Sequence, residues 1–522
     1  MVQKKININL EKALFTDNGL KDFYCPINYN EEYDFLMSLS NNLLKFCYKK
    51  NINKSSIAES LWLSIIYISK ECTSIFTNLS FIERSKKENF KITNDSINSN
   101  IQRIQNKEEI IITNKFAFDF KFKTNLFTKY LRVLKGFYKS RKYSFYPINF
   151  LDKKRDIIIF HYQKEMQYFA EKNNRRLNLC KLEHFFDGEI NLESFVNSDE
   201  LKKFSRLARK IVSKVFEKYK LFLDNFLKES IEKFIFNILK TTLQLKLIGE
   251  RNSKYLTNTV ILGSQGLLPY RVLSRICFKN NIQCYSLDHG CSSGWLNIPS
   301  QSYDEFEYCN NFITSSKNQK KGMEDFLGKK RVTKNMPKIF AVKNKETTIK
   351  SFQISQKPKN FLFVSTHLKK ELITSPIIVN DQISIDIQIR IINKLKKLKK
   401  NVTYKPHPSF DRVILERFTN FLNVNVELRL FELIYSRFDV LIFDSSTSCI
   451  KVALESNIPI IFIDYYQGRI NRRFKEKMEK RVSFININYN KKNKPFFKSD
   501  VLSKAIDDSF KKRNDTEFIK FF

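Results

Sequence analysis

A cation and an imidazole stand together where a predicted strand must stop. The run Val402–Tyr404 favours β-structure, and the motif KPHP follows it at residues 405–408. Its two prolines forbid a continuing central strand, so Lys405 and His407 are displayed at a stiff strand exit. Both side chains can donate hydrogen bonds to phosphate oxygens, Lys405 as a charged donor. The motif therefore predicts an anion-binding position.

A cluster of hydroxyls follows a second predicted strand. The apolar run VLIF at 440–443 is typical of a parallel strand buried on both faces, and it leads directly into DSSTS at 444–448. A helix is predicted over Cys449–Ser456 and another buried strand over Pro459–Asp464. Exposed N–H groups at that helix start, with hydroxyls beside them, suit a phosphate. Ordinary N-capping is the alternative, although it needs a single hydroxyl.

A similar strand-loop-helix-strand unit occurs earlier in the chain. Strands are predicted over Asn258–Leu262 and Ile282–Leu287, with a helix over Leu268–Lys279 between them, and the motif DHG follows at 288–290. Ligands of such sheets bind at the carboxyl ends of the strands. The imidazole of His289 suits proton transfer at neutral pH, and the glycine after it would let a substrate approach closely.

The order of these motifs resembles that of bacterial surface-polysaccharide transferases of the GT-B type. The motifs that carry the resemblance are KPHP at 405–408, DSST at 444–447 and ALE with IP between 453 and 459. The families are CMP-sugar enzymes with an HP motif, such as polysialyltransferases and capsular Kdo transferases, and the CDP-glycerol glycerophosphotransferases. The resemblance covers mainly residues 258–464.

The resemblance implies an activity. It is the transfer of a sugar or an alcohol phosphate from a nucleotide-activated donor, CMP-linked, CDP-linked or other, to a surface polysaccharide or a lipid-linked acceptor. No cofactor is expected besides this donor substrate. No metal is expected either, because a metal-dependent GT-A enzyme would have a D-x-D motif at a strand end, and the sequence contains none.

The resemblance also implies roles for single residues. His289 would be the catalytic base, because a His-Gly pair after an N-domain strand carries the base in the glycerophosphotransferases. Asp288 is the second candidate base, or the residue that orients the imidazole. Glutamates in the helix after the hydroxyl cluster reach the ribose or the nucleobase in many GT-B enzymes. The expected donor-binding residues are Lys405, His407, Ser445, Ser446, Thr447 and Glu455.

The fold class expected is α/β and GT-B-like, with two Rossmann-like domains facing a cleft and a mainly helical N-terminal elaboration. A chain of 522 residues is long for a single core. We expect residues 1–250 to form a helical and mixed part of the first domain and 251–350 to form its Rossmann-like half with the His-Gly loop. Residues 358–522 would form the C-terminal nucleotide-binding domain, after a linker near 345–358.

Local patterns predict further elements. Strands are expected at Ile110–Ile112, Phe116–Phe122 and Ile157–Phe160. Capping chemistry near Ser55 predicts a helix start there. Helices are also expected over Asp386–Lys400 and Arg412–Leu422.

The formal net charge is +38, and lysine is spread over the whole chain. One interpretation is codon bias that enriches Lys, Asn, Ile and Phe together. The other is contact with an anionic membrane face or a polyanionic substrate. No zinc-finger, RNA-recognition or KH pattern occurs, so we expect no nucleic-acid partner.

The expected location is the cytoplasm, with at most a peripheral position at the inner face of the membrane. The N-terminal residues MVQKKININLEKALF lack the apolar core of a secretory signal. No apolar run reaches the ~18 residues that a membrane-spanning helix needs. The nine cysteines are scattered without a C-x-x-C motif, which predicts buried free thiols.

Two other functions remain open from the sequence. The first is a nucleotide-sugar epimerase of the same fold, which would need additional acids in the cleft. The second is a non-catalytic, basic binding protein of the polysaccharide machinery with a vestigial site.

Overall fold

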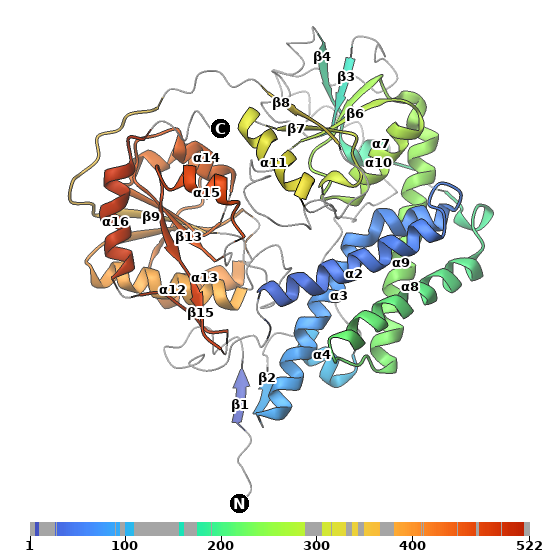
Figure 1. Cartoon of the computed structure of the whole chain (residues 1–522), viewed down its shortest axis with the longest axis horizontal. Coiled ribbons are helices and arrows are strands. Elements are labelled where there is room, and N and C mark those ends of the chain that lie inside the picture. Colours follow the sequence, from blue (N-terminus) through green and yellow to red (C-terminus); the bar gives the residue numbers. More distant parts are fainter. Residues whose placement is uncertain are drawn as a thin grey trace, which may run out of the picture.

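The computed structural model shows two α/β parts and a group of long N-terminal helices (Figure 1). The structure describes residues 6–9, 27, 29–88, 90–93, 100–108, 156–160, 175–188, 190–287, 305–314, 316–329, 337–342, 349–365, 381–408, 410, 412–445, 447–465, 469–491, 493–498 and 500–515. The expected strands near 110 and 120 lie outside them.

The C-terminal part contains a six-stranded, all-parallel sheet with the order β11-β10-β9-β12-β13-β14. Numbered along the chain, this is the order 3-2-1-4-5-6 of the Rossmann fold, which reverses between β9 and β12. All four residues of β12 and all five of β13 are buried, as expected for strands covered on both faces. The strands are β9 (Asn360–Val364), β10 (Asn401–Lys405), β11 (Asn425–Val426), β12 (Val440–Phe443), β13 (Ile460–Asp464) and β14 (Ser483–Asn486).

Five helices surround this sheet, drawn in orange to red in Figure 1. The predicted helix Arg412–Leu422 is confirmed, whereas the helix expected from Asp386 begins five residues earlier and ends at Lys397. A short antiparallel pair, β15 (Asn488–Tyr489) and β16 (Pro495–Phe496), follows the sheet. The helices are α12 (Asp381–Lys397), α13 (Arg412–Leu422), α14 (Ser448–Leu454), α15 (Arg472–Met478) and α16 (Val501–Lys512).

The N-terminal α/β part contains a second six-stranded parallel sheet, with the order β4-β3-β5-β6-β7-β8. The predicted strand Ile157–Phe160 is confirmed as β3, shifted by one residue. With β4 it comes from the region before residue 250, so the first sheet draws on both of the first two predicted segments. The strands are β3 (Asp156–Ile159), β4 (Arg176–Leu179), β5 (Thr259–Ile261), β6 (Gln283–Leu287), β7 (Asn311–Thr314) and β8 (Lys338–Ala341).

Long helices pack against this sheet and against one another. The capping chemistry expected near Ser55 is present, because the Ser55 side chain accepts a hydrogen bond from the Ala58 N–H at 3.2 Å. A small parallel pair, β1 (Ile6–Asn9) and β2 (Phe90–Thr93), accompanies them. The helices are α2 (Tyr29–Lys49), α3 (Ser56–Lys87), α4 (Asn100–Asn106), α7 (Leu182–Phe185), α8 (Ser198–Lys218), α9 (Asn225–Asn252), α10 (Leu268–Lys279) and α11 (Lys317–Lys329).

A buried charge cluster joins three of these helices. Glu59 of α3 is 2% exposed and forms an ion pair with Lys246 of α9 at 2.5 Å. Arg275 and Lys279 of α10 contact the same carboxylate at 2.5 and 3.0 Å. Burial alone would raise the pKa of Glu59, but the three cations lower it to about 2. The carboxylate is therefore ionised and fully engaged at neutral pH.

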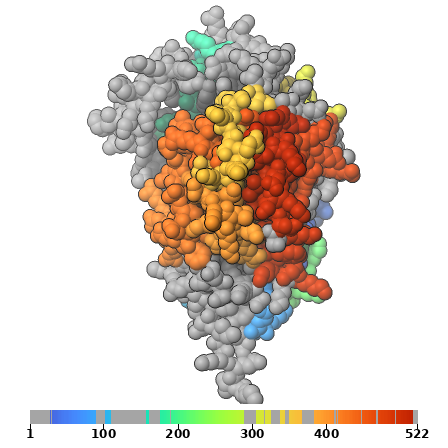
Figure 2. Space-filling view, turned by 90° about the vertical axis from the view of Figure 1, so that its left-hand side faces the viewer, coloured from blue at the N-terminus to red at the C-terminus, as the bar shows by residue number. Residues whose placement is uncertain are grey.

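The segment before β9 lies on the C-terminal domain. Asn457 makes two hydrogen bonds to the main chain of Phe352 in this segment. Its Oδ1 accepts from the Phe352 N–H at 2.8 Å, and its Nδ2 donates to the Phe352 carbonyl at 3.0 Å. Figure 2 shows the yellow segment running over the surface between the orange and dark red parts. Residues 349–358 of the expected linker are thus fixed to the domain that follows them.

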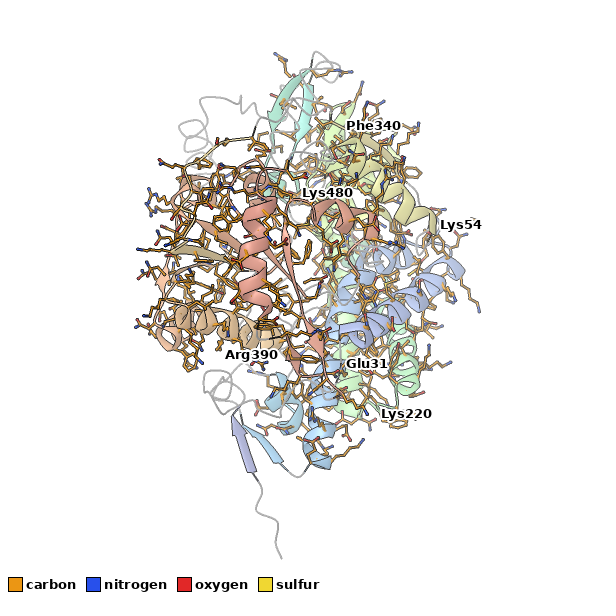
Figure 3. The ribbon with its side chains drawn as sticks, turned by 60° about the vertical axis from the view of Figure 1, so that its left-hand side comes forward. Glu31, Lys54, Lys220, Phe340, Arg390 and Lys480 are labelled. Carbon is orange, nitrogen blue, oxygen red and sulfur yellow. The ribbon has the colours of Figure 1, made fainter. Side chains whose placement is uncertain are left out.

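The predicted fold class is confirmed in its main features: two Rossmann-like domains with parallel sheets and a mainly helical N-terminal region. In the part of the chain described, no helix combines the length and apolarity needed to cross a bilayer. Seven cysteines fall within it, all as free thiols, six of them buried. Cationic side chains cover separate parts of the surface, as the exposed Lys54, Lys220 and Lys480 illustrate (Figure 3).

Candidate anion-binding site at the C-terminal sheet

Strand register places Lys405 and Ser445 at the same edge of the C-terminal sheet. Lys405 ends β10 and pairs with Val364 of β9, which pairs on its other side with Phe443 of β12. Asp444 and Ser445 follow Phe443. Because neighbouring strands lie ~4.8 Å apart, the main chains of Lys405 and Phe443 are separated by about 10 Å. This is the carboxyl edge at the reversal of strand order, where ligands of such sheets bind.

The charged side chain of Lys405 is buried. The residue is 7% exposed, and its Nζ lies 3.5 Å from the Pro406 carbonyl oxygen, which is long for a hydrogen bond. No ion pair joins it to a carboxylate of the described residues. An ammonium group taken out of water without a counter-charge is unfavourable, so this position favours a bound anion.

Two hydroxyls at the neighbouring strand end are buried and unused. The Ser445 Oγ has no hydrogen-bond partner among the described residues, and Ser445 is 9% exposed. Thr447 is the N-cap residue of α14, yet its side chain does not cap the helix. Its hydroxyl lies near the Cys449 thiol, a weak acceptor, and makes no hydrogen bond of ordinary geometry. These hydroxyls are therefore not explained by capping.

Lys405 acts electrostatically on the start of α14. Burial raises the pKa of the Cys449 thiol, and the positive charge of Lys405 opposes that shift. The ammonium group therefore influences residues on the far side of β9.

A buried glutamine links the ends of three strands by hydrogen bonds. Gln388 of α12 donates from Nε2 to Asp444 at 2.7 Å and to Ser365, which follows β9, at 3.1 Å. It also donates to Ser384 at 3.0 Å and accepts from the Tyr404 hydroxyl at 2.8 Å. This network fixes the ends of β9, β10 and β12. Gln388 was not predicted from the sequence, and its spacing of four residues from Ser384 on an apolar helix face was the available signal.

His407 lies two residues beyond Lys405 and is half-buried. Its carbonyl accepts from the Phe410 N–H at 3.0 Å, which turns the chain after the strand exit. The ring is thus close in sequence to the anion position and is not enclosed in the apolar core. Ser446 lies outside the described residues.

Glu455 is separated from the other predicted donor residues. It follows the last residue of α14 as its C-cap, and its carbonyl accepts from the Lys350 N–H at 2.9 Å. α14 has seven residues, and eight steps of ~1.5 Å separate Thr447 from Glu455 by about 12 Å. Lys405, Ser445 and Thr447 thus lie at one edge of the sheet, whereas Glu455 lies at the other end of α14.

The predicted base lies outside the described residues. Asp288 and His289 follow Leu287, the last residue of β6. Leu287 pairs with Ile313 near the end of β7, so β6 stops at the carboxyl edge of the N-terminal sheet. This is the edge at which a catalytic group of such a sheet is expected.

The neighbouring loop at this edge is held by a carboxylate. Glu305 accepts from the Ser264 hydroxyl at 2.7 Å and from the Gln265 N–H at 2.9 Å. The Gln265 side chain donates to Ser286 of β6 at 2.5 Å. These contacts fix the loop after β5 against β6. Nothing in the sequence pattern indicates this role of Glu305, because it lies 40 residues from Gln265.

Comparisons with known proteins give structural likeness alone. No protein-family model and no curated protein matches the sequence. MurG from Acinetobacter baumannii has 9% identity and a TM-score of 0.32, over 70% of this chain and 98% of that chain. UDP-N-acetylglucosamine 2-epimerase from Rickettsia bellii has 11% identity and a TM-score of 0.35, over 70% and 92%.

A third similar structure is the pneumococcal O-GlcNAc transferase GtfA in complex with UDP and GlcNAc, with 15% identity and a TM-score of 0.30. It is matched over 54% of this chain and 54% of its own length, and the GtfA/B complex over 55% of its length. This chain thus spans about half of these two. Identities and TM-scores this low transfer no residue, substrate or activity.

Proposed function

We propose that the protein transfers a sugar or an alcohol phosphate from a nucleotide-activated donor to a surface glycan or a lipid-linked acceptor. The C-terminal domain would bind the donor phosphate. One observation carries this proposal: a buried lysine without a carboxylate partner and two unused hydroxyls lie at one carboxyl sheet edge, beside the reversal of strand order.

A phosphate satisfies each of these groups. A buried hydroxyl without a partner is unfavourable by about 1–3 kcal/mol, and a phosphate oxygen would accept its hydrogen bond. Lys405 would supply the counter-charge, and His407 would donate from the adjacent strand exit. We include Ser446 from its place in the motif. Glu455 would contact the ribose or the nucleobase, which lie away from the phosphate, because it lies at the other end of α14.

The transfer divides between the two domains. The acceptor hydroxyl would attack the activated carbon or phosphorus while the bond to the nucleotide phosphate breaks. Lys405 and the hydroxyls stabilise the negative charge that develops on the departing nucleotide. His289, helped or replaced by Asp288, would take the proton of the acceptor hydroxyl. The net charge of +38 supports a location near an anionic membrane face or a polyanionic glycan.

Kinetics of two histidine variants test this division of roles. With the CMP-, CDP-, UDP- or GDP-linked donor that stabilises the protein in a thermal-shift screen, we expect His407→Ala mainly to raise KM. His289→Ala should mainly lower kcat at saturating donor. The reverse pattern would overturn both assignments.

The products separate the remaining alternatives. Conversion of the donor sugar without an acceptor would indicate an epimerase. Donor binding without turnover by the wild type under every acceptor condition would indicate a non-catalytic binding protein. Transfer or slow donor hydrolysis that both histidine variants reduce supports the transferase.

A further inference from the structure

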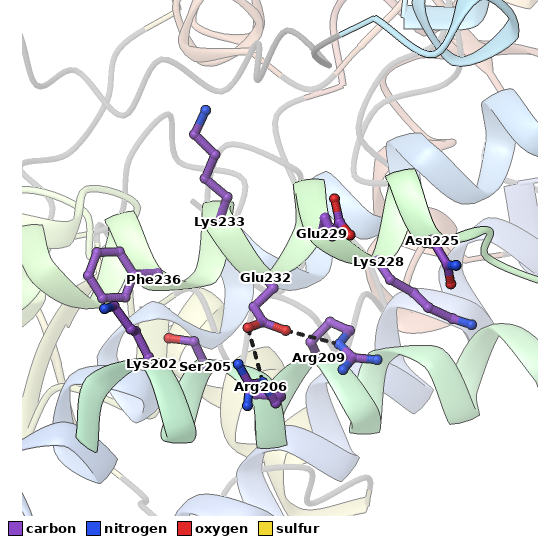
Figure 4. Close-up of a pocket in the computed structure, with 10 residues that line it drawn as sticks. All are labelled: Lys202, Ser205, Arg206, Arg209, Asn225, Lys228, Glu229, Glu232, Lys233 and Phe236. Atoms are coloured by element: carbon purple, nitrogen blue, oxygen red, sulfur yellow. Dashed lines mark hydrogen bonds and ion pairs between the residues drawn. The ribbon is translucent and has the colours of Figure 1, made fainter. Parts of the chain in front are cut away.

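An open pocket of about 490 Å³ lies between helices α8 and α9, in the N-terminal part of the chain. Five cationic and two acidic side chains line it, together with Phe236 (Figure 4). The donor site proposed above lies on β10, β12 and α14 of the C-terminal domain. The pocket is therefore a separate feature, and its chemistry does not depend on the proposed function.

The centre of the pocket is built around one carboxylate. Glu232 projects from α9 between Arg206 and Arg209 of α8 (Figure 4). The two guanidinium groups contact its oxygens at 3.4 and 3.3 Å, which is longer than a strong charge-assisted hydrogen bond. Each guanidinium group has five N–H donors and uses one of them here. Glu232 therefore orients the two guanidinium groups and leaves most of their donors available.

Further positive charge flanks the arginines. Lys228 of α9 lines the pocket and forms no ion pair among the described residues. Lys202 of α8 makes a long contact of 3.6 Å with Asp199, and both side chains are mostly exposed. Such exposed pairs contribute little. The two arginines share the single negative charge of Glu232, so Arg206, Arg209 and Lys228 together carry more positive charge than Glu232 balances.

The two helices hold the pocket in a fixed shape. Beneath the charged surface, Phe204, Ala208 and Val212 of α8 are buried, and so are Ile231 and Ile235 of α9. Close packing of two long helices on apolar side chains leaves the backbone below the arginines little freedom. The charged groups are thus presented by a rigid support.

We propose that this pocket binds a phosphate-bearing anion through Arg206, Arg209 and Lys228. Guanidinium forks match phosphate oxygens in a bidentate manner. A phosphate group carries up to two charges and several acceptor oxygens, whereas a carboxylate carries one charge, and the cation surplus of the pocket favours the former. The phosphate belongs either to a soluble compound or to a lipid headgroup.

Titration of the full-length protein with inorganic tripolyphosphate tests the soluble source. We expect Arg206→Gln/Arg209→Gln to weaken binding by about tenfold or more, because hydrogen bonds to a charged group are lost. Lys203→Gln/Lys210→Gln removes the same charge from exposed positions of α8 outside the pocket and should change affinity by about twofold at most, since exposed charges are screened by salt.

Two further variants keep the result interpretable. Lys228→Gln alone should also weaken binding, and it removes no ion pair of the fold. Lys405→Met removes tripolyphosphate binding at the proposed donor site and should leave the binding that depends on Arg206 and Arg209 unchanged, which separates the two sites. An equal loss in both double variants would show diffuse attraction by the basic surface and would overturn the proposal.

Vesicle sedimentation distinguishes the two sources. Binding to phosphatidylglycerol vesicles but not to phosphatidylcholine vesicles, lost in the arginine double variant and kept in the lysine one, assigns the phosphate to a lipid headgroup. Tripolyphosphate binding without vesicle binding assigns it to a soluble compound. Failure of the wild type to bind either probe at moderate salt overturns the proposal.

Discussion

The hydroxyls of Ser445 and Ser384 differ in what they do for the folded protein. Ser384 accepts a hydrogen bond from Gln388 at 3.0 Å, whereas the Ser445 hydroxyl has no partner among the described residues. Both residues are buried next to the same strand ends. A buried hydroxyl without a partner does not stabilise the apoprotein, which is the physical reason to assign Ser445 to a ligand.

Ser445→Ala should therefore weaken donor binding without weakening the fold. We expect the dissociation constant of the nucleotide donor to rise about tenfold, because one hydrogen bond to a charged phosphate is lost. The free energy of unfolding should stay the same or increase slightly. Ser384→Ala is the matched control and should lower stability instead. A destabilised Ser445→Ala variant with unchanged donor affinity would assign Ser445 a structural role.

At the scale of elements, α12 determines the shape of the sheet edge through Gln388. Its side chain bridges Ser365 and Asp444, which follow strands that meet at the reversal of order, and binds Tyr404 from the third strand. The helix is therefore part of the site without contacting the ligand. An amphipathic pattern predicts such a helix but not which polar residue on its buried face will bridge the strands.

Gln388→Leu should disturb the fold and the donor site together. The change removes the 2.7 Å hydrogen bond to Asp444 and leaves the Tyr404 hydroxyl without its acceptor, so we expect a loss of about 3 kcal/mol in unfolding free energy. Donor affinity should fall as well. Urea unfolding followed by titration of the folded variant measures both. Full stability with intact donor binding would rule out this supporting role.

The ion pairs of Glu59 should make the free energy of unfolding depend on pH. The folded pKa of Glu59 is lowered to about 2, below its ordinary value of 4.5, so its stabilisation is present above the ordinary pKa and is lost as the pH falls through about 2. This shift corresponds to about 3 kcal/mol at neutral pH.

Glu59→Gln should accordingly destabilise the protein by about 3 kcal/mol at pH 7, and the deficit should shrink as the pH is lowered from 4.5 toward 2. Lys246, Arg275 and Lys279 would lose the carboxylate that they share. Denaturant unfolding of both proteins across this pH range provides the comparison. A deficit that is independent of pH would show that packing, and not the charge of Glu59, stabilises these helices.

At the scale of the whole molecule, the α/β pattern predicted most of what positions the site. The helices Leu268–Lys279 and Arg412–Leu422 and the strand Val440–Phe443 occur at the predicted residues. Apolar runs that end in polar motifs are local signals, so they survive without knowledge of the tertiary structure. The same signals placed Lys405 and the hydroxyl cluster at strand ends.

Features that depend on contacts distant in sequence could not be predicted. In the first sheet β3 pairs with β5, about 100 residues later, and β4 pairs with β3 at the sheet edge. The helix predicted over Cys449–Ser456 ends at Leu454, so Glu455 is its C-cap residue. Local sequence fixes neither pairing partners nor helix ends to within one residue.

The two halves of the molecule also touch through a long-range contact. Arg469, which follows β13, donates to Asn30 of α2 at 2.7 Å and lies 4.2 Å over the Tyr33 ring. The N-terminal helices therefore contact the C-terminal domain as well as their own sheet.

Calorimetric titration of the nucleotide donor into wild type and Lys405→Met tests whether Lys405 binds the donor phosphate. We expect saturable binding by the wild type and at least about a tenfold loss of affinity in the variant, because a charge-assisted contact to phosphate is removed while the apolar stem is kept. Lys359→Met changes an exposed lysine at the opposite end of the sheet and should bind like the wild type. Equal affinity of wild type and Lys405→Met would show that Lys405 does not bind the donor phosphate.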